Sequence, residues 1–215
     1  MNSMYETIME LPLFKGIGVD QVSLMLEKTS FDFLNFDKDD ILIRPSDKMA
    51  YIDFILKGEV AISHCIDKIG ICVKEIAGVG RALGAIRLFG LNTQFSCEAK
   101  AISQVSVLRI SKEQYFNLLL TDRIYILNLL NYLSAASQKP LDFISSIKDN
   151  SIFSRLSTLV SIFSSAKSSQ MELLASDSAL ADFCGVELRE FSEWKKNVAN
   201  AGIIRITDNG LIFNC

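Results

Sequence analysis

The chain has 215 residues, 49% of them hydrophobic and 22% charged, which is ordinary for a folded protein and excludes intrinsic disorder. No apolar run approaches the roughly 18 to 20 residues that a membrane-spanning helix needs, and no secretory signal opens the sequence, so we expect a cytoplasmic protein with no membrane partner. The formal net charge of −3 gives no global reason to expect a polyanionic partner.

The first half of the sequence predicts helices followed by an antiparallel β structure. Residues 1–30 carry a helical apolar pattern, with a turn near Gly16. From residue 31 to 110 the chain changes to short runs rich in Ile, Val and Phe, separated by turn residues, which is typical of a β-sandwich or barrel. We expect strands at residues 31–36, 40–43, 51–57, 59–65, 70–76, 95–101 and 104–110.

Beyond Ser111 the apolar spacing becomes three and four, which predicts helices. The segment 124–137 is apolar on more than one face and therefore implies a partner helix. Pro140 should kink or end this helix near residue 138 or 139. We expect a domain boundary near residue 148, dividing the chain into domains 1–148 and 149–215. A new helix over 151–164 and a polar loop over 164–170 should follow.

The last forty residues predict a helix-turn-helix and a wing. Residues 178–183 read as a short amphipathic helix, 184–186 as a turn, and 187–201 as a second helix that closes on Gly202. Two apolar strands follow, joined by an Asn-Gly turn at residues 209–210. This spacing is typical of a protein that reads a DNA groove. However, residues 151–215 contain six Lys and Arg and seven Asp and Glu, so this half of the chain is not basic.

This order of elements resembles the Crp/Fnr-type bacterial transcription regulators over nearly the full length of the chain. Residues 52–60 are similar to the family's strand-glycine-strand hairpin, residues 84–101 occupy the place of its ligand-binding cassette, and residues 185–204 align with its helix-turn-helix without a gap. The resemblance implies an α+β fold with an antiparallel β-roll, a long central dimerisation helix and a winged helix-turn-helix. It also implies a homodimer that binds double-stranded DNA.

The cassette lacks the charged residues of family members that bind cyclic nucleotides. Those members carry Gly-Glu for the ribose hydroxyl and, some ten residues later, Arg-Ser or Arg-Thr for the cyclic phosphate. Here Gly84 is followed by Ala85, and Ser96 is preceded by Phe95. An unpaired buried phosphate costs several kcal/mol, so we expect no cyclic nucleotide here. Arg81 and Arg87 flank the cassette but occupy neither matching position.

Two interpretations of the roll stay open, and we favour the first. Either its own apolar side chains fill the cavity, or it holds an uncharged or aromatic effector of unknown identity. The residues that would line such a pocket are Leu83, Gly84, Ala85, Ile86, Leu88, Phe89, Phe95, Ser96 and Cys97.

No cofactor or metal is expected. The first 64 residues contain no cysteine, and His64 is the only histidine, so haem and iron-sulfur sensing lack ligands. The five cysteines form no C-x-x-C pair, and we expect reduced, buried thiols. One alternative stays open, which is redox sensing by Cys65 and Cys72. These two cysteines are seven residues apart and could face each other across a hairpin.

The second helix of the helix-turn-helix departs from the Crp pattern. Crp-like members present Arg-Glu at its start and an Arg four residues after that Glu, whereas this chain has Leu188-Arg189 and Glu193. Arg189, Ser192 and Lys196 share one face and are the expected base-reading groups, with Lys195 and Arg205 directed to phosphates. The neighbouring glutamates predict weak binding or a different operator.

These observations predict a DNA-binding transcription regulator whose sensor does not bind cyclic nucleotide. The expected dimer interface consists of Ile124, Leu127, Leu130 and Leu133. The alternative is a protein-interaction or scaffold module that kept the fold and lost specific DNA binding. An enzyme is not expected, because the chain has no Ser-His-Asp set, metal-ligand spacing or phosphate-binding glycine loop.

Overall fold

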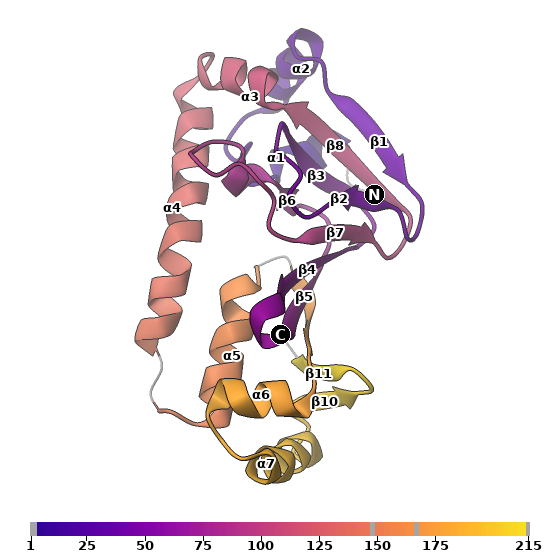
Figure 1. Ribbon diagram of the computed structural model, residues 1–215. Coiled ribbons are helices and arrows are strands. Elements are labelled where there is room, and N and C mark those ends of the chain that lie inside the picture. Colours follow the sequence, from indigo (N-terminus) through magenta and orange to yellow (C-terminus); the bar gives the residue numbers. More distant parts are fainter. Residues whose placement is uncertain (1–3, 147–148, 166–167, 214–215) are drawn as a thin grey trace. The chain divides into compact units, whose positions relative to one another are not determined.

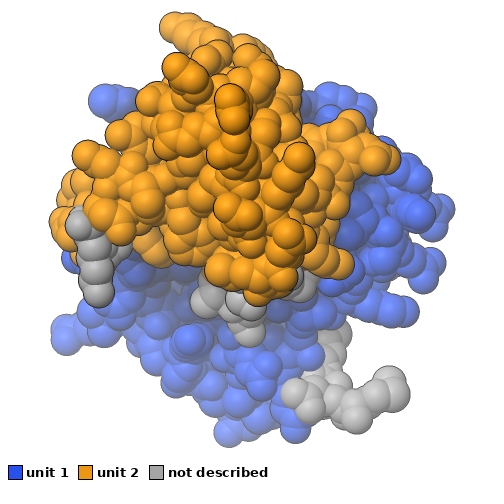
Figure 2. Space-filling view, turned by 90° about the horizontal axis from the view of Figure 1, so that it is seen from below, with its two compact units in different colours: residues 1–60, 78–138 blue, residues 61–77, 139–215 orange. Residues whose placement is uncertain are grey.

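The computed structural model describes residues 4–146, 149–165 and 168–213, which form two compact units (Figure 2). The first unit comprises residues 1–60 and 78–138, and the second comprises residues 61–77 and 139–215. The second unit thus takes a segment from the first half of the chain, in addition to the carboxy-terminal domain that the sequence predicts. No helix among the described residues is long and apolar enough to cross a membrane.

The first unit contains antiparallel β-strands and the helices that cover them (Figure 1). One sheet has the strand order β1-β8-β3-β6, and β2 pairs with β7. The strands are β1 (Asp32–Phe36), β2 (Ile41–Ile43), β3 (Tyr51–Lys57), β6 (Ala82–Leu83), β7 (Glu98–Ala101) and β8 (Val105–Ser111). The helices are α1 (Met4–Met9), α2 (Val19–Lys28), α3 (Lys112–Leu119) and the first part of α4 (Arg123–Ser146), with the 3₁₀ turn η2 at Ala85–Arg87.

Side-chain alternation along β3 and β8 gives the first sheet two different faces. Ile52, Phe54 and Leu108 are fully buried in a cluster with Phe14, from the segment between α1 and α2, and Tyr115 of α3. The residues between them, such as Asp53, point to the opposite face because successive side chains of a strand alternate. The sheet therefore has one apolar face under the helices and one face that also carries charged groups.

Two predictions about the helices of this region have different outcomes. The helix predicted after Ser111 is confirmed: the Ser111 hydroxyl accepts the backbone N–H of Gln114 at 3.1 Å, and the Gln114 side chain accepts the N–H of Ser111 at 2.8 Å. Of the two outcomes predicted for Pro140, a kink or an end of the helix, the end is wrong, because α4 continues through it to Ser146. A proline removes one backbone donor from a helix, and the other turns of this long helix maintain its hydrogen-bonding pattern.

The second unit combines three carboxy-terminal helices with a sheet whose order is β10-β11-β9-β5-β4 (Figure 1). The hairpin consists of β4 (Val60–Ile66), the 3₁₀ turn η1 (Asp67–Ile69) and β5 (Ile71–Ala77). The remaining elements are α5 (Ile152–Phe163), β9 (Ser168–Leu174), α6 (Asp177–Cys184), α7 (Leu188–Asn200), β10 (Ile204–Thr207) and β11 (Gly210–Phe213). The predicted helix-turn-helix and wing are present as α6, α7, β10 and β11.

Strand β9 lies partly where the sequence predicts a polar loop, so that prediction is wrong for residues 168–170. Strand β9 pairs with β11 on one side and with β5 on the other, from Cys72 opposite Leu174 to Ala77 opposite Ser168. Its buried face supplies Met171 and Leu173 to the core of the unit. The strand forms because two partners satisfy its backbone, which outweighs its serine-rich start.

Candidate nucleic-acid interface and effector site

Helix α7 is held in place by its apolar face and by the turn before it. Helix α6 is capped at its start by Ser176, whose hydroxyl accepts the N–H of Ala179 at 3.1 Å, and at its end by Gly185, which has φ of 64°. Glycine adopts this left-handed conformation without the steric penalty of a Cβ. Phe191 of α7 is fully buried, and its ring centroid lies 5.4 Å from that of Trp194. The opposite side of α7 is therefore turned to solvent.

Arg189 and Ser192 lie on this outer side, and both already have partners within the helix. The Arg189 Nε atom lies 3.2 Å from the Glu193 Oε1 atom, with 88% and 67% of the two side chains exposed. The Ser192 hydroxyl donates to the carbonyl oxygen of Leu188 at 2.8 Å. Lys196 is exposed one turn further along. The three base-reading candidates thus share one helix face, and an exposed carboxylate lies among them.

Lys195 and Arg205 have different environments. The Lys195 side chain is only 17% exposed and is paired with Asp177 in the first turn of α6. It links the two helices of the helix-turn-helix. Arg205 is exposed on β10, where its Nη2 atom donates to the Gln170 side-chain oxygen at 3.5 Å. The structure therefore puts one predicted phosphate contact in a partly buried pair and the other on the wing.

A row of polar contacts continues from Gln170 across the sheet of this unit. The Gln170 amide donates to Glu172 at 2.6 Å, and Lys74 lies 2.9 Å from the other oxygen of Glu172. These residues come from β9 and β5, and Arg205 is on β10. Sequence reasoning missed this row because it did not predict β9.

The cassette of the first unit is closely packed around Gly84. This residue has φ of 80°, and a Cβ built on it would lie 2.2 Å from Met49 Cε and 3.1 Å from the Tyr51 carbonyl oxygen. Among the expected pocket residues, four side-chain-bearing members of the cassette are buried and three are partly or largely exposed. The buried residues are Leu83, Ala85, Phe95 and Cys97, and the others are Ile86, Phe89 and Ser96. Leu88, also expected there, is fully buried in the cluster under the helices.

Phe95 is the residue that the sequence resemblance aligns with the arginine of cyclic-nucleotide binders. Its side chain is 8% exposed, its N–H donates to the Asp47 carbonyl at 2.9 Å, and its own carbonyl accepts the N–H of Ser46 at 2.7 Å. The backbone is thus tied to a turn, and a phenyl ring replaces the guanidinium. This position offers an anion no charge.

A buried ion pair on the charged face of the sheet is the feature that sequence reasoning missed in this unit. The Arg109 guanidinium donates two hydrogen bonds to the Asp53 carboxylate, at 2.6 and 2.7 Å, and it lies 5.1 Å from the ring centroid of Tyr51. Only 3% of the Asp53 side chain is exposed. The hydrogen bond with Asp53 raises the pKa of Arg109. The sequence signal for this pair was one charged residue of opposite sign inside each of two mostly apolar strands, Asp53 in β3 and Arg109 in β8.

The expected dimer residues of α4 divide into two sets. Ile124 and Leu133 pack against the core of their own unit. Leu127 and Leu130 are 57% and 56% exposed. The structure therefore leaves two of the four expected dimer residues available to a partner. Further along the helix the exposed apolar residues are Leu141 and Ile144, which continue the seven-residue spacing of Leu127 and Leu130.

The expectation of reduced cysteines is wrong for one pair. Cys65 on β4 and Cys72 on β5 form a disulfide. Cys97 and Cys184 are buried, reduced thiols, as expected, and burial raises the pKa of Cys184 to about 11. Cys215 lies outside the described residues.

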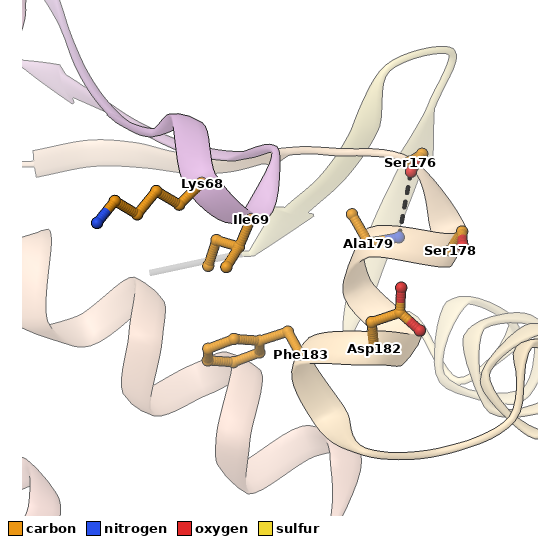
Figure 3. A pocket seen from close by; sticks show the side chains of 7 residues that line it. All are labelled: Lys68, Ile69, Ser176, Ser178, Ala179, Asp182 and Phe183. Carbon is orange, nitrogen blue, oxygen red and sulfur yellow. Dashed lines mark hydrogen bonds between the residues drawn. The ribbon is translucent and has the colours of Figure 1, made fainter.

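A cavity of about 480 Å³ lies between the tip of the β4–β5 hairpin and α6 (Figure 3). Figure 3 shows Lys68 and Ile69 of η1 on one side and Ala179, Asp182 and Phe183 of α6 on the other. The first helix of the helix-turn-helix therefore shares this cavity with the hairpin.

Comparisons with known proteins agree with this fold. Residues 33–122 match the family model described as the cyclic nucleotide-binding domain. The catabolite activator protein of Thermus thermophilus is similar with a TM-score of 0.55 and 18% identity, over 95% of this chain and 93% of that one. The c-di-GMP-responsive global regulator CLP of Xanthomonas campestris has a TM-score of 0.54 and 16% identity, over 92% of this chain and 100% of that one.

The sensor domain of the transcriptional regulator DNR from Pseudomonas aeruginosa is similar over a smaller part of the chain. Its TM-score is 0.50 with 19% identity, and the match covers 61% of this chain and 91% of that one. A search of curated protein sequences found no match. At these identities the structural similarities establish a shared fold.

Proposed function

We propose that this chain, which has the fold of the Crp/Fnr-type transcription regulators, is itself a cytoplasmic, DNA-binding transcription regulator that acts as a homodimer. The observation that carries the proposal is the outer side of α7. Arg189 and Lys196 are exposed there and Ser192 is half-buried beside them, while Phe191 fixes the opposite side of the helix in the core. A rigid helix with exposed polar groups on one face can enter the major groove.

The base-reading roles follow from the chemistry of these side chains. Arg189 is suited to the O6 and N7 acceptors of guanine, and Lys196 to an acceptor or a phosphate further along the groove. The ion pair with Glu193 is exposed, and such pairs contribute about 0.3 to 0.5 kcal/mol. A base or phosphate therefore displaces Glu193 at small cost. Glu193 still lowers the positive potential of the helix, which favours moderate affinity.

Lys195 has a positioning role in this proposal, and Arg205 a phosphate-binding role. The Lys195 pair with Asp177 joins α7 to the first turn of α6, so it fixes the angle between the two helices. Arg205 is exposed on the wing strand β10, where wings commonly approach the sugar-phosphate backbone. Replacing Lys195 should disturb the fold of the helix-turn-helix, and replacing Arg205 should reduce the salt dependence of DNA binding.

Dimerisation is proposed to use the exposed spacing of α4. Leu127, Leu130, Leu141 and Ile144 occupy the a and d positions of a heptad pattern, with Ser134 and Ser137 between them. Burying leucines that are more than half exposed provides the driving force. A two-fold dimer would present two copies of α7 to half-sites one helical turn apart, about 34 Å.

The sensor is proposed not to respond to cyclic nucleotides. Ala85 and Phe95 bring no charge to the cassette, and Arg109, a cation of the neighbouring sheet, is already paired with Asp53. An uncharged or aromatic effector remains compatible with Leu83, Phe89 and the neighbouring apolar residues. Thermal-shift measurements with cyclic AMP and cyclic GMP should show no saturable stabilisation, and a saturable increase with either would contradict this part of the proposal.

Selection of bound sequences from random duplex DNA, at stated salt, tests the DNA-binding proposal. One enriched motif is expected, and the double variant Arg189→Ala with Lys196→Ala should lose gel retention of that motif. A matched control, Lys38→Ala with Arg44→Ala, removes two exposed cations from the first unit and should keep retention. Equal loss of gel retention in both double variants would show that binding depends on the net charge of the protein and not on Arg189 and Lys196.

The oligomeric state is tested separately. Light scattering should find a dimer, and replacing Leu127 and Leu130 by Asp should halve the mass without unfolding the chain. A wild-type monomer at working concentration would contradict the proposal.

A second candidate is a protein-interaction or scaffold module on the same fold. The acidic residues of α7, including Glu190 and Glu193, favour it because they repel phosphate. Selection that enriches no sequence, from a protein that is folded and dimeric, would support this candidate over the first.

A further inference from the structure

The disulfide between Cys65 and Cys72 closes the hairpin that the first half of the chain contributes to the second unit. Cys65 lies on β4 and Cys72 on β5, and the 3₁₀ turn η1 lies between them. The residues on either side of Cys72, Ile71 and Val73, are 1% and 0% exposed and belong to the core of the unit. The sulfur bridge is therefore attached directly to a core strand.

The bridge is accessible from solvent although the residues that flank Cys72 are buried. Cys65 is exposed and Cys72 is half-buried, because side chains alternate along a strand. Cys97 and Cys184, in contrast, are 3% and 2% exposed. Thiol–disulfide exchange requires a thiolate to reach a disulfide sulfur. Among the described cysteines, only this pair meets that requirement.

We infer that Cys65 and Cys72 form a reversible thiol–disulfide exchange site for dithiol reductants and their oxidised forms. A reductant thiolate attacks Sγ of the exposed Cys65, the Cys65–Cys72 bond breaks, and Cys72 leaves as a thiolate that takes up a proton. The second thiol of the reductant then attacks the mixed disulfide and releases Cys65. The chain gains two thiols, and the reductant becomes a disulfide; an oxidised dithiol reverses both steps.

The structural consequence is confined to one part of the hairpin. Strand β5 has β9 as a second neighbour along its length, so its pairing survives reduction. The turn η1 loses the covalent bond that closes its loop. Lys68 and Ile69 of this turn line the cavity beside Ala179 and Phe183 of α6 (Figure 3). Reduction should therefore loosen the cavity wall formed by the hairpin and leave β5 and β9 in place.

The chain offers a direct chemical test, because trypsin cleaves between the two cysteines. Cleavage after Lys57, Lys68 and Lys74 gives peptides 58–68 and 69–74, each with one cysteine of the pair. Full-length folded protein is equilibrated with buffers that contain reduced and oxidised dithiothreitol in defined ratios, alkylated and digested. The linked peptides should predominate under oxidising buffers and disappear under reducing ones. Peptides 88–100 and 168–189, which carry Cys97 and Cys184, are internal controls and should stay unmodified while the protein is folded.

Hydrogen exchange tests the structural part. Reduction should raise amide exchange at residues 66–70 about tenfold or more, and exchange in β9 should change little. The variant Cys65→Ser should exchange at the reduced rate in both buffers, with Trp194 fluorescence as the check that the unit is folded.

Each outcome bears on the inference. Absence of linked peptides under oxidising buffer would refute the pairing. Linked peptides that resist reduction until the protein is denatured would show that the disulfide is a permanent structural bond, which would refute reversible exchange. Equal exchange at residues 66–70 in both buffers would overturn the proposed loosening. The inference goes beyond the proposed function and does not require DNA binding, since none of these measurements includes DNA.

Discussion

Replacing Glu193 by Gln should strengthen DNA binding, because this carboxylate pairs with Arg189 and lies on the side of α7 that we propose enters the groove. The Arg189–Glu193 pair has an N–O distance of 3.2 Å, and its side chains are 88% and 67% exposed. Exposed pairs four residues apart on a helix contribute about 0.3 to 0.5 kcal/mol. The wild-type protein must break this pair when Arg189 binds DNA, whereas the Glu193→Gln variant has no such pair to break. The variant should therefore gain this amount of binding free energy.

The second contribution is repulsion between the Glu193 carboxylate and phosphate. Two unit charges about 7 Å apart in water repel by about 0.6 kcal/mol, and physiological salt reduces this to about 0.25 kcal/mol. The sum is about 0.7 kcal/mol for each α7, or about threefold in affinity. With two copies of α7 in a dimer, the Glu193→Gln variant should bind about tenfold more tightly.

The assay is fluorescence anisotropy of a labelled duplex taken from the selection, at several KCl concentrations. Glu190→Gln is the matched control, because it removes the same charge from the same helix and leaves the Arg189–Glu193 pair intact. It should gain about twofold from reduced repulsion alone. If Arg189 moves to a phosphate, the log–log salt dependence should steepen by about 0.9 per helix in the Glu193 variant.

Two results would refute this reasoning. Equal gains in the Glu193 and Glu190 variants would show that the ion pair does not restrain Arg189. Weaker binding by Glu193→Gln would show that Glu193 is needed for binding, as expected if its carboxylate accepts a hydrogen bond from a cytosine amino group.

Three further predictions concern stability. Phe191→Ala should destabilise the second unit by about 3 to 5 kcal/mol, because the ring is fully buried, and the single tryptophan, Trp194, should report this by fluorescence in urea; an unchanged midpoint would contradict the packing. Arg109→Met should cost about 3 to 5 kcal/mol by stranding the buried Asp53 carboxylate, and adding Asp53→Leu should recover much of the loss in circular-dichroism melts; additive losses would argue against a coupled pair. Hydrogen bonds from Ser151 and Ser154 lower the pKa of Asp149 from 3.8 to about 2, so its stabilisation of the start of α5 should be complete above about pH 4 and should be lost as pH falls towards 2. An NMR titration midpoint for Asp149 near 3.8 would show that these hydrogen bonds do not hold in solution.

Much of the fold could be predicted because local signals agreed with the final structure. The change of apolar spacing at Ser111, the capping pair with Gln114 and the Asn-Gly turn before Leu211 each fix one element by short-range chemistry. The helix-turn-helix was predictable for the same reason, since Gly185 ends α6 and the apolar positions of α7 lie on one face.

What the sequence did not predict depends on partners that are distant along the chain. Strand β9 has a polar beginning, and it forms because β5 and β11 flank it. The Asp53–Arg109 pair joins two strands that are 56 residues apart, so no short motif reveals it. Cys65 and Cys72 are close in sequence, yet an odd number of cysteines without a familiar spacing favoured free thiols.

The expected site residues show the same division. The outer face of α7 follows from helical spacing, so the solvent exposure of Arg189 and Lys196 was predictable. The burial of Lys195 against Asp177 depends on the crossing of α6 and α7, which spacing alone does not give. On α4, spacing groups Ile124 and Leu133 with Leu127 and Leu130, whereas the packing of the first unit separates them.

Because β5 lies beside β9, the carboxy-terminal unit cannot be excised with a single cut. A fragment that begins at residue 139 would lack residues 61–77 and would leave one edge of β9 with unpaired backbone groups beside Met171 and Leu173. Bare edges of this kind recruit strands from other molecules, so such a fragment should self-associate. A soluble minimal version would need residues 61–77 grafted in front of residue 139 through a flexible linker, which makes the hairpin an obligatory component of any chimera built from this chain.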